Sequence, residues 1–406
     1  MNYLFMDINS VLKNVLKKIS LSKEEEQDLN KIGNDVAGKV GGVVGGSVAK
    51  GTMVKKGMQD IDIFVLFDSE KDTEKLSGIL KKAGLRGRIV HGSRNYFQAR
   101  INGFIAEIVP IVKFQNPEDV KNVADFSLKH VEYIKKKIAR KKKLADEIKL
   151  AKVFCYANEC YGAESYVSGF SGYALELLVI YFGSFLRFLK GIQNKKIIDI
   201  EKFFKNEKEI FQELNENKLQ SPVVLIDPVY KFRNVCAGLS DETFCKFLKT
   251  AKEFLKKQNE SFFEKKELDA DNLMRDAKKR KAKFLELKFE TDRQEGDIAG
   301  TKMKKFFKFL AKEIERKGQK ILRQEFYYHS GQEAEGYLII KENKEIEIKG
   351  PGINNKEAVK NFRKARKKIY FRKGFAYSRE KVDLNEILSH IKSFEQEIGV
   401  QFSVLD

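Results

Sequence analysis

Hydrophobic and polar positions change their spacing several times along this chain, and each spacing predicts a different kind of element. Residues 1–32 carry apolar positions at helical intervals, which predicts helical structure ending near Gly33. Residues 60–67, DIDIFVLF, and residues 103–112, GFIAEIVPIV, are short β-branched and aromatic runs typical of buried strands. Residues 40–115 therefore predict a compact α/β unit.

The middle of the chain has a helical pattern from about residue 122 to residue 265. Residues 131–162 combine long charged turns with an apolar stripe. Residues 172–192 are apolar nearly all round, which predicts burial among other helices. Residues 221–240 contain two prolines and are predicted as a loop that interrupts the helices.

After about residue 278 the alternation typical of strands returns. Residues 282–289, 320–329 and 335–350 alternate apolar and polar positions, and residues 301–318 between them have helical spacing. This order predicts an antiparallel sheet backed by helices. Residues 399–406, GVQFSVLD, are predicted as a last strand.

Composition narrows the class of partner. The chain has 406 residues, 42% of them apolar, so it can form a substantial core and is not globally disordered. Its 78 Lys and Arg against 58 Asp and Glu give a formal charge of +20. Such an excess favours a polyanionic partner, because phosphate contacts supply most of the affinity for nucleic acids. The alternative is a Lys-rich surface that serves solubility alone.

Neither a membrane span nor a disulfide framework is expected. No apolar run approaches the roughly 18–20 residues that a helix needs to cross a bilayer. The apolar patch at the N-terminus is interrupted by Asp7 and has no secretory layout. Four Cys residues without a CxxC pair, far from any matching His pair, argue against disulfides and structural zinc. We therefore expect a cytoplasmic location.

The chemistry centres on the glycine-rich segment before the first strand. A Walker loop requires Ser or Thr directly after its Lys, whereas Lys50 is followed by Gly51, and no GxGxxG fingerprint fits either. Gly46 would let the backbone approach phosphates, and Ser47 could hydrogen-bond one of them at a helix start. The alternative is an ordinary surface loop.

Asp60 and Asp62 lie two positions apart in the first predicted strand, so their side chains project from one face. Two carboxylates this close repel each other unless a cation lies between them, and Mg²⁺ suits oxygen ligands together with substrate phosphates. Glu107, in the second predicted strand, offers a third carboxylate. The alternative for Glu107 is an edge-strand side chain that faces water.

Longer sequence motifs show a resemblance to a known family. Gly46, Ser47, Lys50, Thr52, the DIDIFV run and the EIVP run resemble the polymerase-β nucleotidyltransferase superfamily. Residues 169–185 (GFSGYALELLVIYFGSF), 226–240 (IDPVYKFRNVCAGLS) and 347–355 (EIKGPGINN) follow in order. Together they resemble the archaeal, class I CCA-adding enzymes over nearly the whole chain.

This resemblance implies an α+β multidomain protein with a polymerase-β-like nucleotidyltransferase head, a helical neck, and an α/β body and tail. The boundaries implied are residues 1–138 for the catalytic head, 139–277 for the neck, 278–351 with 396–406 for the body, and 352–395 for a basic tail. The resemblance also implies an enzyme that adds or repairs the 3′-terminal CCA of tRNA with CTP, ATP and two Mg²⁺ ions. The enzyme implied by the resemblance releases pyrophosphate and uses no nucleic-acid template. The resemblance is also compatible with a homodimer.

Site residues follow from the same resemblance. Asp60, Asp62 and Glu107 fall on the metal-binding acids, although the third acid is usually Asp. The family also usually has Asp-Pro where this chain has Tyr230-Lys231, and more often Arg at the position of Lys50. The residues implied to bind the nucleotide are Gly46, Ser47, Lys50 and Thr52 of the phosphate loop, His130, Lys152 and Tyr161 at the triphosphate and sugar, and Arg233 beside the incoming base.

Contacts with tRNA are expected in the basic C-terminal region. Acceptor-stem RNA is A-form, so recognition should use shape and backbone rather than base sequence. The alternative is a solvated basic helix. Two rival functions also remain, a poly(A) polymerase of the same superfamily and an inactive relative that only binds RNA. The residues expected to contact tRNA are Lys360, Arg363, Lys364, Arg366, Lys367 and Arg372.

Overall fold

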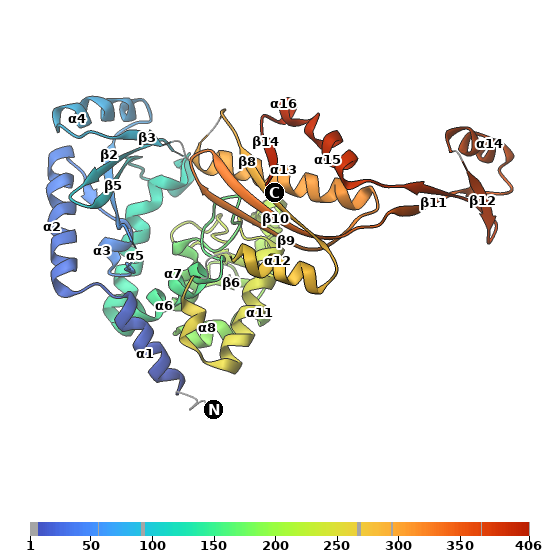
Figure 1. Ribbon diagram of the computed structural model, residues 1–406. Helices are drawn as coiled ribbons and strands as arrows, with labels where there is room; N and C mark the ends of the chain where they lie inside the picture. The colour runs from blue at the N-terminus through green and yellow to red at the C-terminus, as the bar shows by residue number, and fades with distance from the viewer. Residues whose placement is uncertain are drawn as a thin grey trace. The chain divides into compact units, whose positions relative to one another are not determined.

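A computed structural model describes residues 7–55, 57–90, 94–265, 269–293, 295–366 and 368–405. The chain divides into two compact units, Met1–Lys266 and Glu267–Asp406 (Figure 1). The finer division into head, neck, body and tail stays a prediction.

The sheet of the N-terminal unit has five strands in the order β1-β2-β5-β4-β3, with β2 and β5 parallel and the other pairs antiparallel. Ile61 and Ile63 on β2 are fully buried in a core that includes residues of α2. Both strands expected from residues 60–67 and 103–112 are confirmed. The strands are β1 Val43–Val44, β2 Asp60–Phe67, β3 Arg88–Val90, β4 Tyr96–Ile101 and β5 Phe104–Val112.

The first helical segment differs from the expectation. It forms two helices, α1 Ile8–Ile19 and α2 Lys23–Val40, and α2 runs past Gly33 to end at Gly41, which has φ +66°. The predicted end near Gly33 is therefore wrong. A Cβ on Gly33 would lie 3.2 Å from the Ile61 side chain, so this glycine serves close packing of α2 on the sheet.

The rest of this unit is mainly helical. Most apolar side chains of segment 172–192 are buried as expected, although Tyr181 is exposed. Gly183 at φ +80° ends one helix, and the Ser184 side chain caps the next. Aromatic side chains, among them Phe154 and Phe247, fill the core between these helices. The longer helices are α5 Ser127–Arg140, α6 Lys143–Ala157, α7 Gly172–Phe182, α8 Phe185–Gly191 and α11 Asp241–Lys257.

Several short elements complete the unit. Residues 221–240, predicted as a loop, contain the short strand β7, which pairs in parallel with β6. The short elements are α3 Gly46–Lys50, η1 Lys71–Lys75, α4 Leu76–Lys82, η2 Pro117–Asp119, η3 Val123–Phe126, η4 Ile192–Asn194, β6 Ile197–Asp199, α9 Glu207–Glu213, α10 Glu216–Leu219, β7 Val224–Ile226 and η5 Glu260–Phe263.

The C-terminal unit contains a four-stranded antiparallel sheet in the order β14-β8-β10-β9. Leu285, Leu287 and Phe289 alternate along β8 and pack in a core with Met303 and Phe306 of α13. The predicted antiparallel sheet with helical backing is confirmed. Its elements are α12 Ala270–Lys279, β8 Lys283–Glu290, α13 Gly296–Arg316, β9 Lys320–Ser330, β10 Glu333–Lys341, α15 Leu384–Lys392, α16 Glu395–Ile398 and β14 Gln401–Leu405.

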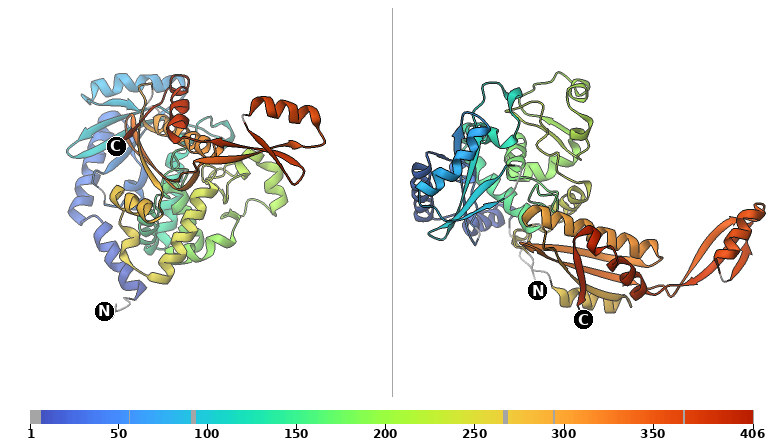
Figure 2. Two further views of the ribbon diagram at one scale, coloured as in Figure 1. Left: turned by 45° about the vertical axis from the view of Figure 1, so that its right-hand side comes forward. Right: turned by 90° about the horizontal axis from the view of Figure 1, so that it is seen from above.

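A smaller sheet in the same unit has the order β11-β13-β12 and carries α14 (Figure 2). The antiparallel pair β11 and β13 leads to it, and α14 packs on β11. The elements are β11 Glu345–Gly352, α14 Lys356–Ala365, β12 Ile369–Arg372 and β13 Phe375–Lys381.

Among the helices of the described residues, none combines the length and the apolar character that crossing a bilayer requires.

Candidate active site

The three predicted acids lie on one face of the parallel strand pair. Asp62 on β2 is the direct register partner of Glu107 on β5, and Asp60 lies two residues earlier on β2. All three are half-buried, whereas the intervening Ile61 is fully buried on the opposite face. Burial raises the pKa of Tyr96, on β4, to about 12, and the charges of all three carboxylates add to that rise. The three carboxylates therefore all lie near enough to Tyr96 to affect its ionisation.

Within the described ranges, no group of three or more His, Cys, Asp or Glu side chains is arranged so that it could hold a metal ion. Strand register nevertheless places Asp62 and Glu107 directly opposite each other on neighbouring strands, and such strands lie about 5 Å apart. Gln98 on β4 donates to Glu107 Oε1 at 3.1 Å and so orients the third acid. In donor chemistry and backbone placement these residues fit magnesium, which prefers oxygen ligands.

Gly45 and Gly46, at the start of α3, are required by the close approach of this segment to β2. The Gly45 amide donates to the Asp62 carbonyl at 2.8 Å. Gly46 has φ +56°, and a Cβ there would lie 1.6 Å from Asp62 Oδ2. Only glycine fits such a position. The loop thus brings Ser47 and Lys50, both in α3, next to the acids.

Lys50, Thr52 and Lys152 converge on a glutamate that the sequence analysis did not single out. Glu176, on α7, is fully buried, and its Oε2 accepts from Lys50 Nζ at 2.7 Å. Its Oε1 accepts from Lys152 Nζ and from Thr52 Oγ1, each at 2.8 Å. Lys152 Nζ also donates to Thr52 Oγ1 at 3.0 Å and to the Thr52 carbonyl at 3.3 Å. Helices α3, α6 and α7 are therefore joined by one buried polar cluster.

Electrostatics in this cluster favour the ionised carboxylate. Burial by itself raises the pKa of Glu176, but the charges of Lys152 and Lys50 outweigh it and hold the pKa at about 2. Burial lowers the pKa of Lys152, and the charge of Glu176 opposes that change. The charge of the buried carboxylate thus favours the charged ammonium form of Lys152 against the effect of burial.

A second buried carboxylate, Asp227, organises His130 and Arg233. Arg233 Nη1 donates to Asp227 Oδ2 at 2.8 Å, and His130 Nε2 lies 3.1 Å from the same oxygen. Tyr173 Oη donates to Asp227 Oδ1 at 3.0 Å, and its ring stacks on that of His130 at 4.1 Å between centroids. Burial lowers the pKa of His130, although Asp227 opposes the change. Asp227 thereby fixes two predicted nucleotide-binding residues at once.

Tyr161 lies close to the Glu176 cluster. Its hydroxyl would be 2.8 Å from a Cβ on Gly172, so the glycine at the start of α7 leaves room for it. Burial raises the pKa of Tyr161, and the charges of Glu176, Glu164 and Asp62 raise it further. The structure therefore brings every predicted catalytic and nucleotide-binding residue into the N-terminal unit, either along the face of the acids or in the two buried clusters.

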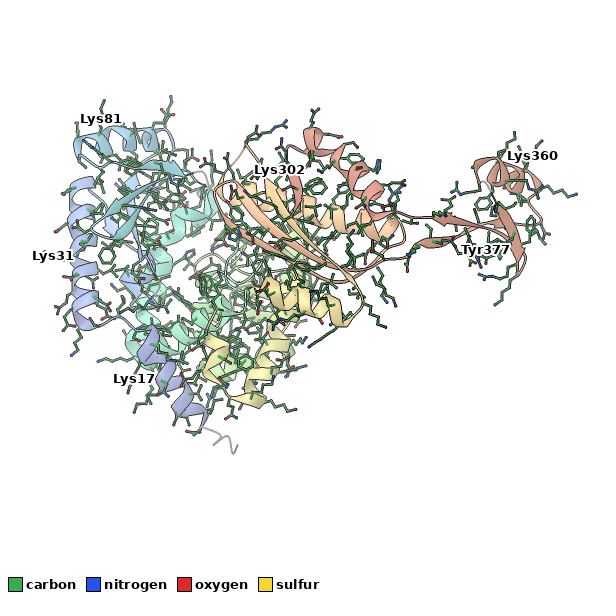
Figure 3. The ribbon with its side chains drawn as sticks, in the orientation of Figure 1. Lys17, Lys31, Lys81, Lys302, Lys360 and Tyr377 are labelled. Carbon is green, nitrogen blue, oxygen red and sulfur yellow. The ribbon has the colours of Figure 1, made fainter. Side chains whose placement is uncertain are left out.

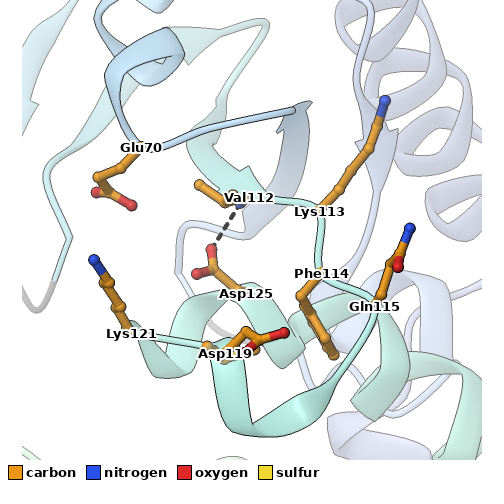
Figure 4. A pocket seen from close by; sticks show the side chains of 9 residues that line it. Glu70, Val112, Lys113, Phe114, Gln115, Asp119, Lys121 and Asp125 are labelled. Atoms are coloured by element: carbon orange, nitrogen blue, oxygen red, sulfur yellow. Dashed lines mark hydrogen bonds between the residues drawn. The ribbon is translucent and has the colours of Figure 1, made fainter.

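A separate cavity of about 350 Å³ opens at the carboxyl end of β5 (Figure 4). Asp125 on its wall accepts from the Val112 amide at 2.7 Å and pairs with Arg94 at 3.0 Å. Val112 ends β5, whereas Glu107 lies five residues earlier on that strand. The cavity is thus not the predicted active site.

The predicted tRNA-contacting residues gather on α14 and the strand after it. Lys360, labelled in Figure 3, Arg363 and Lys364 are exposed on α14. Arg366 pairs with Glu380 at 2.6 Å, and Arg372 pairs with Glu347. Lys367 lies outside the described residues. Other lysines project from helices of both units, among them Lys17, Lys31, Lys81 and Lys302 in Figure 3.

Glu176 and Asp227 each stand in a sequence context that indicates a buried charge. Each is a lone acid within an apolar run, LELLVI for Glu176 and VVLID for Asp227. A charge in such a setting needs a partner. The same argument drew attention to Asp60 and Asp62, but the partners of Glu176 lie 24 or more positions away.

Comparison with known proteins agrees with this geometry. Residues 29–160 match a family model described as a nucleotidyltransferase domain, and residues 146–264 match one described as the second domain of tRNA nucleotidyltransferase. Among solved structures, a Cid1 poly(U) polymerase is similar in fold alone, with a TM-score of 0.51 and 12% identity over 64% of this chain and 99% of that one. The fold and the site define a nucleotidyltransferase of the polymerase-β type.

Curated relatives indicate which family of nucleotidyltransferases the chain belongs to. The CCA-adding enzyme of Methanocaldococcus jannaschii is 30% identical over 92% of this chain and 88% of its own length. That of Nanoarchaeum equitans is 37% identical over 67% of this chain and 66% of its own length. That of Pyrococcus abyssi is 31% identical over 78% of this chain and 74% of its own length. The chain belongs to the family of CCA-adding enzymes and is a CCA tRNA nucleotidyltransferase, as the sequence motifs predicted.

Proposed function

We propose that this enzyme adds or repairs the 3′-terminal CCA of tRNA with CTP and ATP, without a nucleic-acid template and with release of pyrophosphate. The observation that carries the proposal is the register of Asp62 opposite Glu107, with Asp60 on the same face and the glycine loop packed against Asp62. An anionic nucleotide and a metal are the natural occupants of such a face.

Asp60, Asp62 and Glu107 would hold two magnesium ions. Bound there, the ions would stabilise both the attacking and the leaving oxygen of an in-line displacement. Glu107 is one methylene longer than the aspartate usual in the family, and its hydrogen bond from Gln98 restricts where the longer carboxylate can lie.

The proposed reaction transfers a nucleotidyl group to the tRNA. The 3′-hydroxyl oxygen bonds to the α-phosphorus, and the bond from that phosphorus to the oxygen bridging to the β-phosphate breaks. Pyrophosphate leaves with that oxygen, and the hydroxyl proton passes to solvent water. Lys50 and Lys152 place positive charge where the triphosphate gains negative charge on its leaving part. Gly46 lets the backbone amides of the loop approach phosphate oxygens, with Ser47 beside them.

Recognition of the nucleotide would use the remaining buried residues. Arg233, fixed by Asp227, would lie beside the incoming base, and His130 and Tyr161 would contact the triphosphate and sugar. Thr52 supports this region by its bonds to Lys152 and Glu176.

Contact with tRNA would fall on the basic residues of α14 and β12, namely Lys360, Arg363, Lys364, Arg366 and Arg372, with Lys367 between them in the sequence. No ion pair joins Lys360, Arg363 or Lys364 to another described residue, so their charges are available to phosphates.

A cytoplasmic location and a homodimer also belong to the proposal. All four Cys residues are free thiols, three of them buried, which is consistent with a reducing compartment. Light scattering on the purified protein would measure the assembly: a mass of two chains supports the dimer, and one chain excludes it.

The decisive experiment offers CTP or ATP separately to tRNA lacking CCA, CA or A. We expect CMP addition to the first two substrates and AMP addition to the third, with growth stopping at CCA. Asp60→Ala and Asp62→Ala should each abolish incorporation, whereas Asp68→Ala, at an exposed acid just after the same strand, should retain it. Long A tails would indicate a poly(A) polymerase. Binding of tRNA without pyrophosphate release would indicate an inactive relative.

A further inference from the structure

Glu176 joins two lysines of the nucleotide site through different oxygens of one carboxylate. Its Oε2 holds Lys50 at 2.7 Å and its Oε1 holds Lys152 at 2.8 Å. The carboxylate itself is fully buried on α7. We propose that Glu176 is a positioning residue that holds Lys50 for the triphosphate of the incoming nucleotide; this inference rests on the proposed function.

The two lysines differ in how many of their donors are engaged. An ammonium group has three N–H donors. Lys152 has three acceptors, namely Glu176 Oε1, Thr52 Oγ1 and the Thr52 carbonyl. Lys50 has only Glu176 as a partner among the described residues, which leaves two donors for phosphate oxygens. Lys50 would thus contact the phosphates, while Lys152 supplies charge from a fixed position.

Charge balance explains why a carboxylate is needed here. Two buried ammonium groups within reach of one carboxylate repel each other strongly, because the surroundings screen them poorly. Glu176 offsets one of the two charges, so the cluster carries one net positive charge toward the substrate. Without that carboxylate, Lys50 has no fixed partner and can turn toward solvent, since its side chain is 10% exposed.

The position of the cluster links it to the acids rather than to the core alone. Lys50 closes the short helix that begins at Gly46, whose backbone packs against the Asp62 carboxylate. The same loop thus touches both a predicted metal ligand and the Glu176 cluster. A purely structural ion pair would not need this connection.

The test compares Glu176→Gln, which keeps the shape but removes the charge, with Glu147→Gln. Glu147 is a partly buried acid on α6 that accepts from the Phe185 amide at 2.8 Å, which makes it a matched control. We expect the KM for both CTP and ATP to rise roughly tenfold or more in Glu176→Gln, as loss of a charge-assisted contact predicts. The KM for tRNA should not change, Glu176→Asp should restore part of the nucleotide affinity, and Glu147→Gln should behave as wild type.

A second comparison tests the same inference if the Glu176→Gln protein does not fold. Lys152→Gln with Glu176→Gln removes one positive and one negative charge together, so the cluster keeps the net charge of +1 that it has in wild type. Relative to Lys152→Gln alone, the double variant should raise the nucleotide KM further, because only Lys50 still depends on Glu176. An equal KM in these two proteins, or an unchanged KM in a folded Glu176→Gln protein, would overturn the inference. If wild-type protein incorporates no nucleotide, the proposed function fails instead.

Discussion

Replacing Asp227 by asparagine should destabilise the N-terminal unit, because this fully buried carboxylate accepts three hydrogen bonds and also contacts His130. Its Oδ1 accepts from Tyr173 Oη and from the Val229 amide, both at 3.0 Å. Its Oδ2 accepts from Arg233 and lies against His130. An amide nitrogen in place of Oδ2 would face the Arg233 donor and leave that guanidinium without its counter-charge.

The expected cost follows from the burial of the two partners. Removing one member of a buried ion pair typically costs about 3–5 kcal/mol. Asp227 is fully buried, but the Arg233 side chain is 25% exposed and can recover part of its hydration. We therefore expect a loss of about 2–3 kcal/mol in the free energy of unfolding. At about 2–4 °C for each kcal/mol, the melting temperature should fall by about 4–12 °C.

Thermal unfolding of the intact chain, followed by circular dichroism, measures this change. Asp146→Asn is the control, because Asp146 is exposed and lies 3.8 Å from Lys149, a pair worth under about 1 kcal/mol. The nucleotide KM should also rise in Asp227→Asn, since Arg233 loses its anchor. A melting temperature within about 1 °C of wild type would refute the argument that this buried pair is structurally important.

Three further predictions concern other parts of the molecule. Gly46→Ala should abolish nucleotide incorporation, since its Cβ would overlap Asp62 Oδ2, whereas Gly38→Ala, with nothing within 4 Å, should retain full activity. The pKa of Glu176 is about 2 in the folded protein against 4.5 ordinarily, so its stabilisation, on the order of 3 kcal/mol, is present above pH 4.5 and lost as pH falls toward 2. Denaturant unfolding should therefore show the wild-type advantage over Glu176→Gln shrinking across that range, and a constant difference would contradict it. Charge reversal of Lys360, Arg363 and Lys364 should weaken tRNA binding and lower its salt dependence by about two to three counterions, and an unchanged salt slope would exclude these contacts.

Local chemistry made the catalytic face predictable. Alternation along residues 60–67 requires Asp60 and Asp62 to share a face, because side chains in a strand alternate. The apolar surroundings of Glu107 indicated a partner for its charge. Motif resemblance then supplied the family, and the comparisons confirmed it.

Tertiary contacts decided where α2 ends and which residues pair with the buried acids. Gly33 has the sequence character of a helix end, yet it lies inside α2 because the helix packs closely on Ile61. Glu176 and Asp227 appear along the chain as isolated acids, and their partners come from other helices and loops. No local pattern encodes such pairings, since they depend on which helices the core brings together.

The strands β2 and β5, the face that bears Asp60 and Asp62, and the family were therefore all predictable from local sequence patterns. Only the tertiary structure decided that Asp62 lies opposite Glu107, 45 positions later, and that one buried carboxylate joins Lys50 to Lys152. The physical reason is that periodicity acts over a few residues, whereas register and buried charge pairing are settled when distant segments pack and lose water.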